Sequence, residues 1–353
     1  MDFSIAAILA QDGVSTGAVY ALLALATVLV FSVTRVIFIP QGEFVAYGAL
    51  TMASLQAGKF AATAVLLVAL GILAFLMELA DAARQFRIMG HGRGLAKTLL
   101  LAGVKDVLFP LAVLALASLV PAATLPILLQ AGLTLLIVVP MGALLYRVAY
   151  QPLAEASVLV LLIVSVGVHF ALVGLGLVMF GAEGSRTTPF SDASFQLGTL
   201  TVSGQSATII LVSLLLIGAL YAFFERTLAG KALRATALNR LGARLMGIET
   251  GRAGRLAFTL AVGMGALSGI LIAPLTTVYY DSGFLIGLKG FVGAIVGGLA
   301  SYPVAAAGAL LVGLLESYSS FWASAFKEVI VFTLVIPVLL WRSLTSTHVE
   351  DGE

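Results

Sequence analysis

Uncharged apolar stretches of about 18 residues or more recur along this chain, and they restrict its possible folds more than any other feature. An α-helix rises about 1.5 Å per residue, so roughly 20 apolar residues are enough to cross the hydrocarbon core of a bilayer. Of the 353 residues, 61% are hydrophobic and only 10% are charged. A soluble domain carries roughly 25% charged residues, spread through every element. We therefore expect a chain that uses lipid as its solvent.

Eleven apolar segments predict about eleven crossings, or ten with one re-entrant piece, although the later segments are short for complete spans. They are residues 14–33, 36–56, 60–80, 99–121, 124–146, 158–180, 207–224, 256–275, 287–300, 304–318 and 329–341. The predicted fold is an all-α, polytopic transmembrane bundle of about 10–11 helices, with one cytoplasmic helix in a loop. We expect a single transmembrane domain over residues 1–353.

The basic residues between these segments predict the orientation of the bundle. They fall in five intervals, at Arg35, at 84–97, at Arg147, at 226–255 and at Arg342. If every segment crosses, all five lie on one side, which the positive-inside tendency assigns to the cytoplasm. The N-terminus and residues 181–206 would then lie outside and the C-terminus inside. The start of the chain lacks a basic leader with a cleavage site, so we expect no removable signal peptide.

Several classes of site are disfavoured by composition. The chain has no cysteine, and His91, His169 and His348 are widely separated, so no metal site is expected. Basic residues flank the spans and form no basic face, which argues against nucleic-acid binding. Residues 90–98 approach a phosphate-binding loop, but no glycine directly precedes Lys97. We expect no ATP binding by this chain and no catalytic residues, and an intramembrane enzyme is disfavoured.

The 37 glycines include two groups inside apolar segments, at residues 263–269 and 287–298. Small residues three or four positions apart allow helices to pack closely in lipid, which is one interpretation of both groups. The other is a broken helix around Ser301, Tyr302 and Pro303, because interrupted backbone at membrane depth occurs mainly beside a cavity.

Glu43 is a carboxylate in an apolar segment, where a charge is costly unless it faces water or a partner. Pro40 and Gly42 weaken regular helix around it, and Gln41 adds a polar group. The run therefore indicates one of two arrangements. It is either a kinked segment lining a pore, or a helix start near the inner interface where Glu43 stabilises the helix dipole.

Two other ionisable residues lie in apolar surroundings. Lys289 follows Asp281 and precedes glycine-rich sequence, which favours a position at the outer rim with the ammonium reaching toward water. His169 lies in the middle of a span, where a partner on a neighbouring helix is a commoner arrangement than a solute contact. In a channel or a secondary transporter driven by an ion gradient, Glu43, Asp281 and Lys289 would instead form the ion path.

The loop at residues 227–254 contains a predicted amphipathic helix from about Lys231 to Met246. Basic residues lie along it, and apolar residues recur at four-residue spacing, at Leu233, Ala237, Leu241 and Leu245. Such a helix can lie on anionic lipid, or it can be presented to the groove of a soluble partner.

Three stretches occur in an order that is specific as a set. Residues 13–48 contain Pro40-Gln41-Gly42-Glu43-Phe44, and residues 146–153 read Tyr-Arg-Val-Ala-Tyr-Gln-Pro-Leu. The third stretch runs over residues 230–248 and is followed by Lys-Gly-Phe at 289–291 and Gly-Gly-Leu-Ala-Ser-Tyr-Pro at 297–303. Together they resemble the permease subunits of branched-chain amino acid ABC importers.

The resemblance implies a translocation pathway for a small solute, such as a hydrophobic amino acid, which opens by alternating access. It implies pathway residues among Phe38, Gln41, Gly42, Glu43, Tyr47, His169 and Lys289. The residues expected to contact the ATPase are Gly230, Leu233, Arg234, Ala237, Asn239, Leu241, Leu245 and Gly247. Implied partners are two cytoplasmic ATPase subunits that hold ATP and magnesium, a second permease or second copy, an extracytoplasmic solute-binding protein and membrane lipid. The implied location is a bacterial inner membrane.

The sequence also departs from the family pattern. Phe38 stands where the family usually has Asn, and Leu238 and Leu241 replace residues that are commonly polar or acidic. Residues 60–121 match nothing in the pattern and are interpreted as two added helices. An even number of added crossings keeps every later loop on its own side of the membrane.

Overall fold

The computed structural model of the chain describes residues 3–89, 95–197 and 200–345. Within these ranges, nine helical spans are long and apolar enough to cross a membrane. Seven are built on single long helices: α1 (Phe3–Thr34), α3 (Ala62–Met89), α6 (Ile127–Leu145), α7 (Val158–Phe180), α8 (Gly204–Arg226), α11 (Thr250–Ile272) and α13 (Tyr302–Trp322). The other two are compound: α4 (Leu95–Gly103), a π-helical turn (Val104–Leu108) and α5 (Phe109–Leu119), then α14 (Lys327–Thr333) with α15 (Val335–Thr345).

Two shorter apolar helices complete the bundle, α2 (Gln41–Gln56) and α12 (Ser282–Val296). At about 24 and 22 Å, each is shorter than the hydrocarbon core of roughly 30 Å. Outside the bundle lie α9 (Leu228–Leu238), α10 (Arg240–Leu245) and an antiparallel hairpin of β1 (Ser194–Leu197) and β2 (Leu200–Ser203). All eleven predicted apolar segments contain helix, which confirms the all-α polytopic fold.

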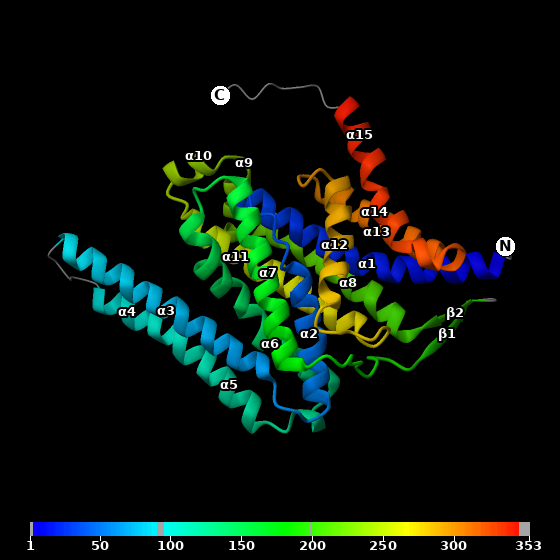
Figure 1. Cartoon of the computed structure of the whole chain (residues 1–353), viewed down its shortest axis with the longest axis horizontal. Coiled ribbons are helices and arrows are strands. Elements are labelled where there is room, and N and C mark those ends of the chain that lie inside the picture. Colours follow the sequence, from blue (N-terminus) through cyan, green and yellow to red (C-terminus); the bar gives the residue numbers. More distant parts are fainter. Residues whose placement is uncertain (1–2, 90–94, 198–199, 346–353) are drawn as a thin grey trace.

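Helix α1 forms the interior of the bundle, running from the N-terminus into its middle (Figure 1). It packs against α11, α12 and α13. Leu22, Leu23 and Ala26 are fully buried. A helix that is apolar on every face needs partners on every face, and α1 has them over residues 17–30.

Glycines bring the central helices close together, as the first interpretation of the two glycine groups predicted. A Cβ at Gly269 of α11 would collide with the Val45 carbonyl of α2. A Cβ at Gly293 of α12 would lie 2.7 Å from the Cβ of Ala309 on α13. Close backbone approach of this kind is the main source of helix association in lipid.

The alternative, a broken helix near residues 301–303, is not what the structure has there. Helix α12 ends at Val296, and a turn with left-handed backbone at Gly298 and Leu299 leads into α13 at Tyr302. The interrupted backbone lies elsewhere, between α1 and α2, where residues 35–40 are not helical. Arg35, with φ of 61°, begins this segment.

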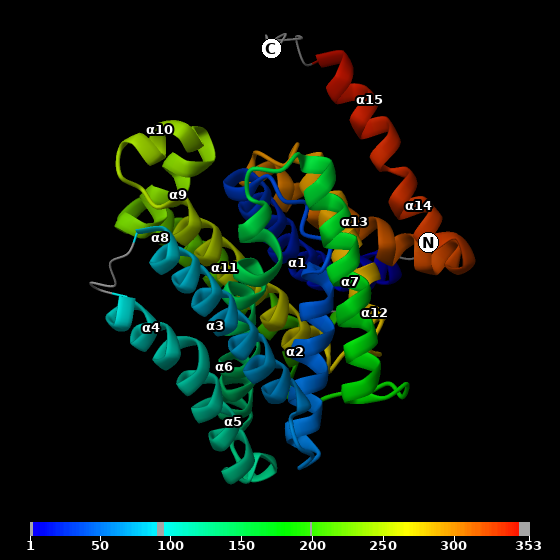
Figure 2. The ribbon, with the colours of Figure 1, turned by 60° about the vertical axis from the view of Figure 1, so that its left-hand side comes forward.

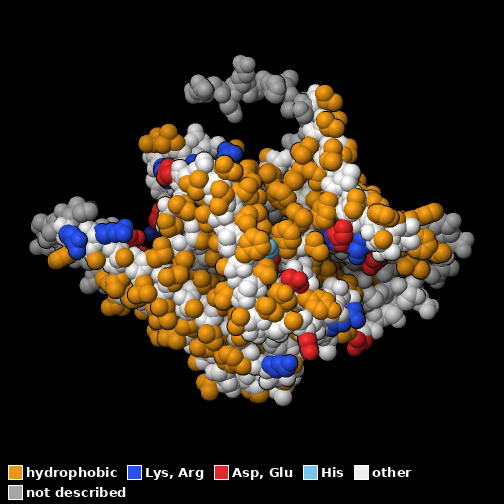
Figure 3. Space-filling model, viewed as in Figure 1, with side chains coloured by type: hydrophobic (Ala, Val, Ile, Leu, Met, Phe, Trp, Pro, Cys, Tyr) orange, Lys and Arg blue, Asp and Glu red, His pale blue; other side chains and the backbone are white. Residues whose placement is uncertain are grey.

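Helix α3 and the compound helix α4–α5 form a hairpin at the edge of the bundle, which we call the edge hairpin (residues 62–119; Figure 2). It rests mainly on α6. Its outward side chains, including Leu73, Leu76 and Leu108, are exposed. Apolar side chains also cover most of the face in Figure 3, as expected of a surface in contact with lipid. The predicted pair of helices at residues 60–121 is therefore present.

The loops predicted to be cytoplasmic gather on one face of the bundle. Arg35, Leu233 of α9 and the turn at 298–300 line one cavity. Ser185, in the segment 181–206 that is predicted to be external, pairs with Val278 in the connection between α11 and α12. These two connections are therefore neighbours.

Candidate functional site

Helix α2 begins at Gln41, inside the bundle, and its first residues favour a helix start at that position. Pro40, with φ of −63°, precedes the first turn, and proline is favoured at helix starts since its missing N–H would be unpaired there. Glu43 falls in the first turn, near the positive end of the helix dipole. The prediction of a helix start is thus confirmed. Its predicted place near the interface is wrong, as the partner of Glu43 makes clear.

That partner is His169, the twelfth of the 23 residues of α7 and so at the middle of a span. Oε1 of Glu43 lies 3.0 Å from Nδ1 of His169. Glu43 is completely buried. Its Oε2 has no hydrogen-bond partner within the described part of the chain. The pair places one satisfied and one unsatisfied carboxylate oxygen at mid-membrane, where an ionisable group is expensive and usually functional.

Two further polar residues of α2 tie it to its neighbours. The Gln41 amide donates to the Ala261 carbonyl of α11 at 3.2 Å, while its Oε1 is buried without a partner among the described residues. The Tyr47 hydroxyl donates to the Leu172 carbonyl of α7 at 2.7 Å. The structure therefore brings together Gln41, Glu43, Tyr47 and His169, as a group we call the α2 site.

The α2 site also depends on the absence of side chains at two glycines. Gly42 of α2 and Gly283 of α12 face each other, and a Cβ on either would collide with the carbonyl oxygen of the other. The starts of two short helices thus touch at the centre of the bundle. Helix termini that meet at membrane depth are typical of solute sites in transporters.

A cavity of about 280 Å³ lies beside the α2 site. It is lined by Thr27, Ile37, Phe38, Ile39, Gln41, Leu162, Phe284, Gly287, Leu288 and Phe291. The ring of Phe284 packs on the His169 ring with centroids 4.8 Å apart, which connects the cavity wall to the buried pair. Its largely apolar wall with few polar groups suits a small, mostly hydrophobic solute.

Phe38 takes an apolar role in place of the polar one expected of the family. Its ring contacts those of Phe44, Tyr150 and Phe258, with centroids 6.1, 6.0 and 4.6 Å away. Phe38 is buried in this aromatic cluster and shows one edge to the cavity.

Lys289 does not lie at the outer rim, so the prediction that its ammonium reaches water is wrong. It is buried within α12, and its Nζ lies 2.5 Å from Glu316 of α13 and 3.4 Å from Glu328 of α14. The Tyr20 hydroxyl of α1 donates to the other oxygen of Glu316 at 2.6 Å. Two partly buried carboxylates satisfy the ammonium where water would be needed at the rim. This cluster is separate from the α2 site.

Glu316 and Glu328 were not predicted as partners of Lys289, although the sequence contains a signal for them. Glu316 lies in the predicted segment 304–318, and Glu328 directly precedes the segment 329–341. A carboxylate in or beside a span implies a partner, and Lys289 was the available cation.

The predicted single helix from Lys231 to Met246 is wrong, because the chain breaks at Asn239. Helix α9 ends at Leu238, and the Asn239 side chain accepts a hydrogen bond from the Gly242 N–H at 2.8 Å, which starts α10. Asparagine is a strong N-cap residue. Because Asn239 caps the start of α10, the backbone leaves the helical conformation there and α9 ends.

The break separates the predicted apolar stripe into two faces. Leu233 is buried and Ala237 is half-buried against the bundle, whereas Leu241 and Leu245 of α10 are 68% and 80% exposed. We call the exposed apolar residues around α10 the α10 patch: Leu238, Leu241, Leu245 and Met246. Exposed apolar side chains on a short loop helix mark a docking surface or a lipid contact.

The remaining predicted loop residues support α9 and α10. Gly230 lies so close to the backbone of Phe223 and Phe224 that a Cβ would collide with it. Gly247, with φ of 81°, ends the α10 turn. Arg234 forms an exposed ion pair with Glu225 at 2.5 Å.

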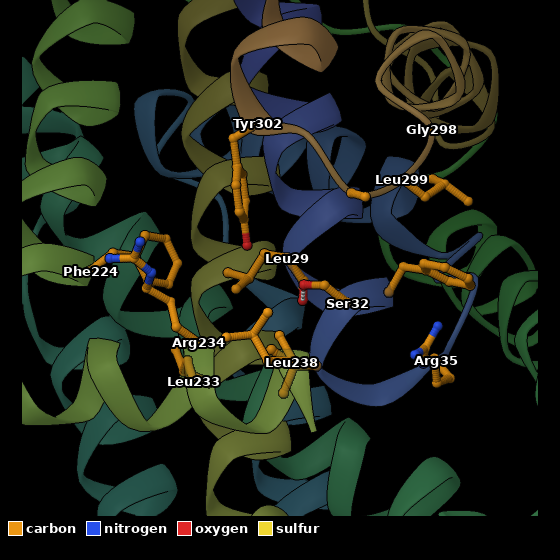
Figure 4. Close-up of a pocket in the computed structure, with 14 residues that line it drawn as sticks. Leu29, Ser32, Arg35, Phe224, Leu233, Arg234, Leu238, Gly298, Leu299 and Tyr302 are labelled. Atoms are coloured by element: carbon orange, nitrogen blue, oxygen red, sulfur yellow. Dashed lines mark hydrogen bonds between the residues drawn. The ribbon is translucent and has the colours of Figure 1, made fainter. Parts of the chain in front are cut away.

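Helix α9 closes a cavity of about 420 Å³ against α1 and the α12–α13 turn (Figure 4). In Figure 4, Tyr302 points into it toward Leu29 and Ser32, and Leu233 and Leu238 enter from α9. The cavity connects the loop to the segment that precedes α2.

Helix α10 is fastened to the α6–α7 connection by two arginines. Arg240 donates to the Ala154 carbonyl at 2.9 Å, and Arg244 donates to Glu155 at 2.5 Å. The hydrogen bond from Arg244 holds the pKa of the Glu155 carboxyl below its ordinary value. A displacement of α10 would therefore act on the ends of α6 and α7, and His169 belongs to α7.

No group of three or more metal-ligating side chains occurs within the described ranges. His91, His348 and the glycine-rich start of the segment 90–98 lie outside those ranges.

Comparison with known proteins gives the chain a family. Residues 9–339 match the family described as the permease component of the branched-chain amino acid transport system. The chain is a member of that family. This permease is accordingly a multi-pass membrane protein, with the helices described above as its spans. No solved structure matches it.

Several curated relatives of the permease carry the same description. It is 31% identical over 201 residues to the high-affinity branched-chain amino acid transport system permease protein LivH of Escherichia coli K12, a match that covers 55% of this chain and 65% of LivH. It is 29% identical over 208 residues to BraD of Pseudomonas aeruginosa, covering 57% and 68%. The probable LivH of Methanocaldococcus jannaschii is 27% identical over 238 residues, covering 65% and 73%. The chain thus spans just under two thirds of the length of the E. coli protein it matches.

Proposed function

We propose that this permease forms the translocation pathway of an ATP-driven importer for a branched-chain or other small hydrophobic amino acid. Family membership supports the transport role. The observation that carries the location of the pathway is the Glu43–His169 pair at mid-membrane, beside the largely apolar cavity. Isolated ionisable groups at this depth are costly and are retained mainly along solute or ion paths.

The proposed assembly contains a second permease, two ATPase subunits that bind ATP and magnesium, and an extracytoplasmic solute-binding protein. The proposed cellular location is a bacterial inner membrane, with the N-terminus outside and the C-terminus in the cytoplasm. An impermeant thiol reagent tests the orientation because the chain has no cysteine. Asp192→Cys should react in intact cells, and Leu238→Cys only after permeabilisation. The opposite pattern would invert the topology.

Coupling would run from the α10 patch to the α2 site. An ATPase that holds the patch would move α10, and Arg240 and Arg244 would transmit the movement to the α6–α7 connection. Rocking of α7 would displace His169 from Glu43 and change access to the cavity. Small shifts become discrete states where packed helices have two arrangements.

Reconstitution in vesicles tests the proposal. The complete complex should accumulate radiolabelled leucine only with ATP on the ATPase side and with the solute-binding protein present. Withdrawing ATP while maintaining a sodium or proton gradient should abolish uptake. Gradient-driven uptake by the permease alone would contradict the proposal and favour a secondary transporter.

A further inference from the structure

A cavity of about 800 Å³ lies away from the α2 site. It separates the edge hairpin from the main body, and we call it the hairpin cleft. The hairpin side contributes residues of α3 and α4–α5, and the body side contributes the turns that follow α6 (residues 146–153) and the start of α11. It lies on the face of the molecule that carries α9 and α10, which stand beside the edge hairpin in Figure 2.

The lining of the hairpin cleft contains more charged residues than the linings of the two cavities described above. Its cationic residues are Arg84, Lys105, Arg147, Arg252 and Arg255, and its carboxylates are Glu78, Asp81, Asp106 and Glu249. Five cations against four carboxylates leave a formal surplus of one positive charge. A single negative charge in the cleft would therefore neutralise it.

Some of these charges already have partners. Arg147 forms ion pairs with Glu78 and with Asp106, the latter at 2.9 Å. Arg252 and Arg255 pair with Glu249 at 2.6 and 3.5 Å. The pairs of Arg147 join the two walls of the cleft, and those of Glu249 lie within the body-side wall.

The remaining charged groups are Arg84 and Asp81 of α3 and Lys105 of the compound helix α4–α5. None of the three has an ion-pair partner among the described side chains, so the two cations outnumber the one carboxylate. Gln151 also lines the cleft, and its Oε1 is buried without a hydrogen-bond partner in the described part of the chain. Two free guanidinium or ammonium groups and a free acceptor suit an anionic group that also carries hydroxyls.

The surroundings of the cleft are apolar and exposed. Leu101 lines it, and Leu100, Val104 and Leu108 continue along the outside of the same compound helix. The site therefore combines cations with a hydrophobic flank at the end of a span. Membrane phospholipids present the same combination, with the phosphate next to the acyl chains.

We propose that the hairpin cleft binds the headgroup of an anionic phospholipid, with Arg84 and Lys105 on its phosphodiester and its acyl chains along the outside of α4–α5. The phosphodiester supplies the one negative charge that the lining lacks. The headgroup hydroxyls can donate to Gln151. The site is independent of the transport pathway, so its occupancy can be measured without transport.

Native mass spectrometry of the purified permease with added phosphatidylglycerol tests the proposal. The double substitution Arg84→Gln with Lys105→Gln should weaken binding roughly twenty-five-fold, about fivefold for each cation. Arg87→Gln is the matched control, because Arg87 lies on the same helix but outside the lining. It should bind like the wild type. Equal retention of phosphatidylglycerol by the double variant and the wild type would overturn the site.

Two further measurements identify the ligand, and the second of them does not depend on the double variant being folded. Millimolar inorganic phosphate should leave the lipid bound, and its displacement of the lipid would assign the cleft to a free phosphate instead. Ala102 also lines the cleft and is not one of the two proposed cations. In the otherwise cysteine-free chain, phosphatidylglycerol should protect Ala102→Cys from a thiol reagent at least several-fold better than phosphatidylcholine. Equal protection by the two lipids would contradict an anionic headgroup site.

Discussion

Glu43 of α2 and His169 of α7 lie 3.0 Å apart, Oε1 to Nδ1, in the middle of the bundle. They are 126 residues apart in sequence, and they join the start of a short helix to the centre of a long one. A contact of this kind couples the two helices as long as it is intact. If the contact between Glu43 and His169 breaks during transport, the α2 site acts as a gate of the pathway. If the contact persists, it only holds the two helices together.

We predict that Glu43→Gln keeps the permease folded and lowers leucine uptake about tenfold or more. The amide keeps the size of the side chain but cannot ionise, and loss of the native interaction of a buried hydrogen-bonding group costs about 1–3 kcal/mol, or roughly tenfold. Thr51→Val is the matched control, because it removes another buried hydrogen bond of α2, to the Thr63 hydroxyl, outside the α2 site. Equal loss in both variants would indicate a general packing effect and no special role for Glu43.

The α10 patch gives a prediction about docking. Leu241→Asp or Leu245→Asp should release the ATPase or uncouple ATP hydrolysis from uptake, because a carboxylate buried in an interface costs several kcal/mol. Leu228→Asp is the control, since Leu228 is an equally exposed leucine of α9 outside the patch. Co-purification of the ATPase measures the effect. Retention of the ATPase by both α10 variants would leave the patch as a lipid contact.

Leu233 and Ala237 should behave differently, although the sequence grouped them with Leu241 and Leu245. Leu233→Asp places a carboxylate against the bundle, where Leu233 is buried. It should therefore reduce the yield of folded permease, even without the ATPase present. Fluorescence-detected size-exclusion chromatography distinguishes this loss of folding from a loss of docking. A well-folded Leu233→Asp variant that fails only to dock would restore the single-helix interpretation.

The Lys289 cluster predicts a compensating pair of substitutions. Lys289→Met leaves Glu316 and Glu328 without their cation. It should destabilise the permease by about 3–5 kcal/mol, which is measured as a lower midpoint of thermal unfolding. Adding Glu316→Gln should recover part of that loss, since fewer unpaired charges then remain. Lys59→Met, at an exposed position, should have little effect. A double variant that is less stable than Lys289→Met would contradict the pairing.

The sequence was sufficient for the fold class, the number of apolar segments and four residues of the α2 site. Charge and hydropathy patterns of spans are properties of each segment alone, so they can be read without tertiary contacts. The pairing of Glu43 with His169 depends on how α2 meets α7, and no local pattern specifies that meeting. For the same reason Lys289 was assigned to the rim, because its carboxylate partners are contributed by two later helices.

The prediction of one unbroken helix in the loop at residues 227–254 was a local error. Asn239 is an N-cap residue in the middle of an otherwise periodic segment, and capping ended α9 although the four-residue apolar spacing continued. Periodicity alone overstated the length of the helix. It also placed buried Leu233 and exposed Leu241 on one stripe.

The accessibility of the cavity beside the α2 site tests most directly whether it is the translocation pathway. Ile39→Cys puts a single thiol on the cavity wall of the cysteine-free chain, and Val178→Cys puts one on an exposed apolar position of α7 as a control. We predict that a small methanethiosulfonate reagent modifies position 39 in the reconstituted complex, that saturating leucine slows this reaction, and that modification stops uptake. No reaction at position 39 with or without ATP, or unchanged uptake after full modification, would contradict a pathway through this cavity.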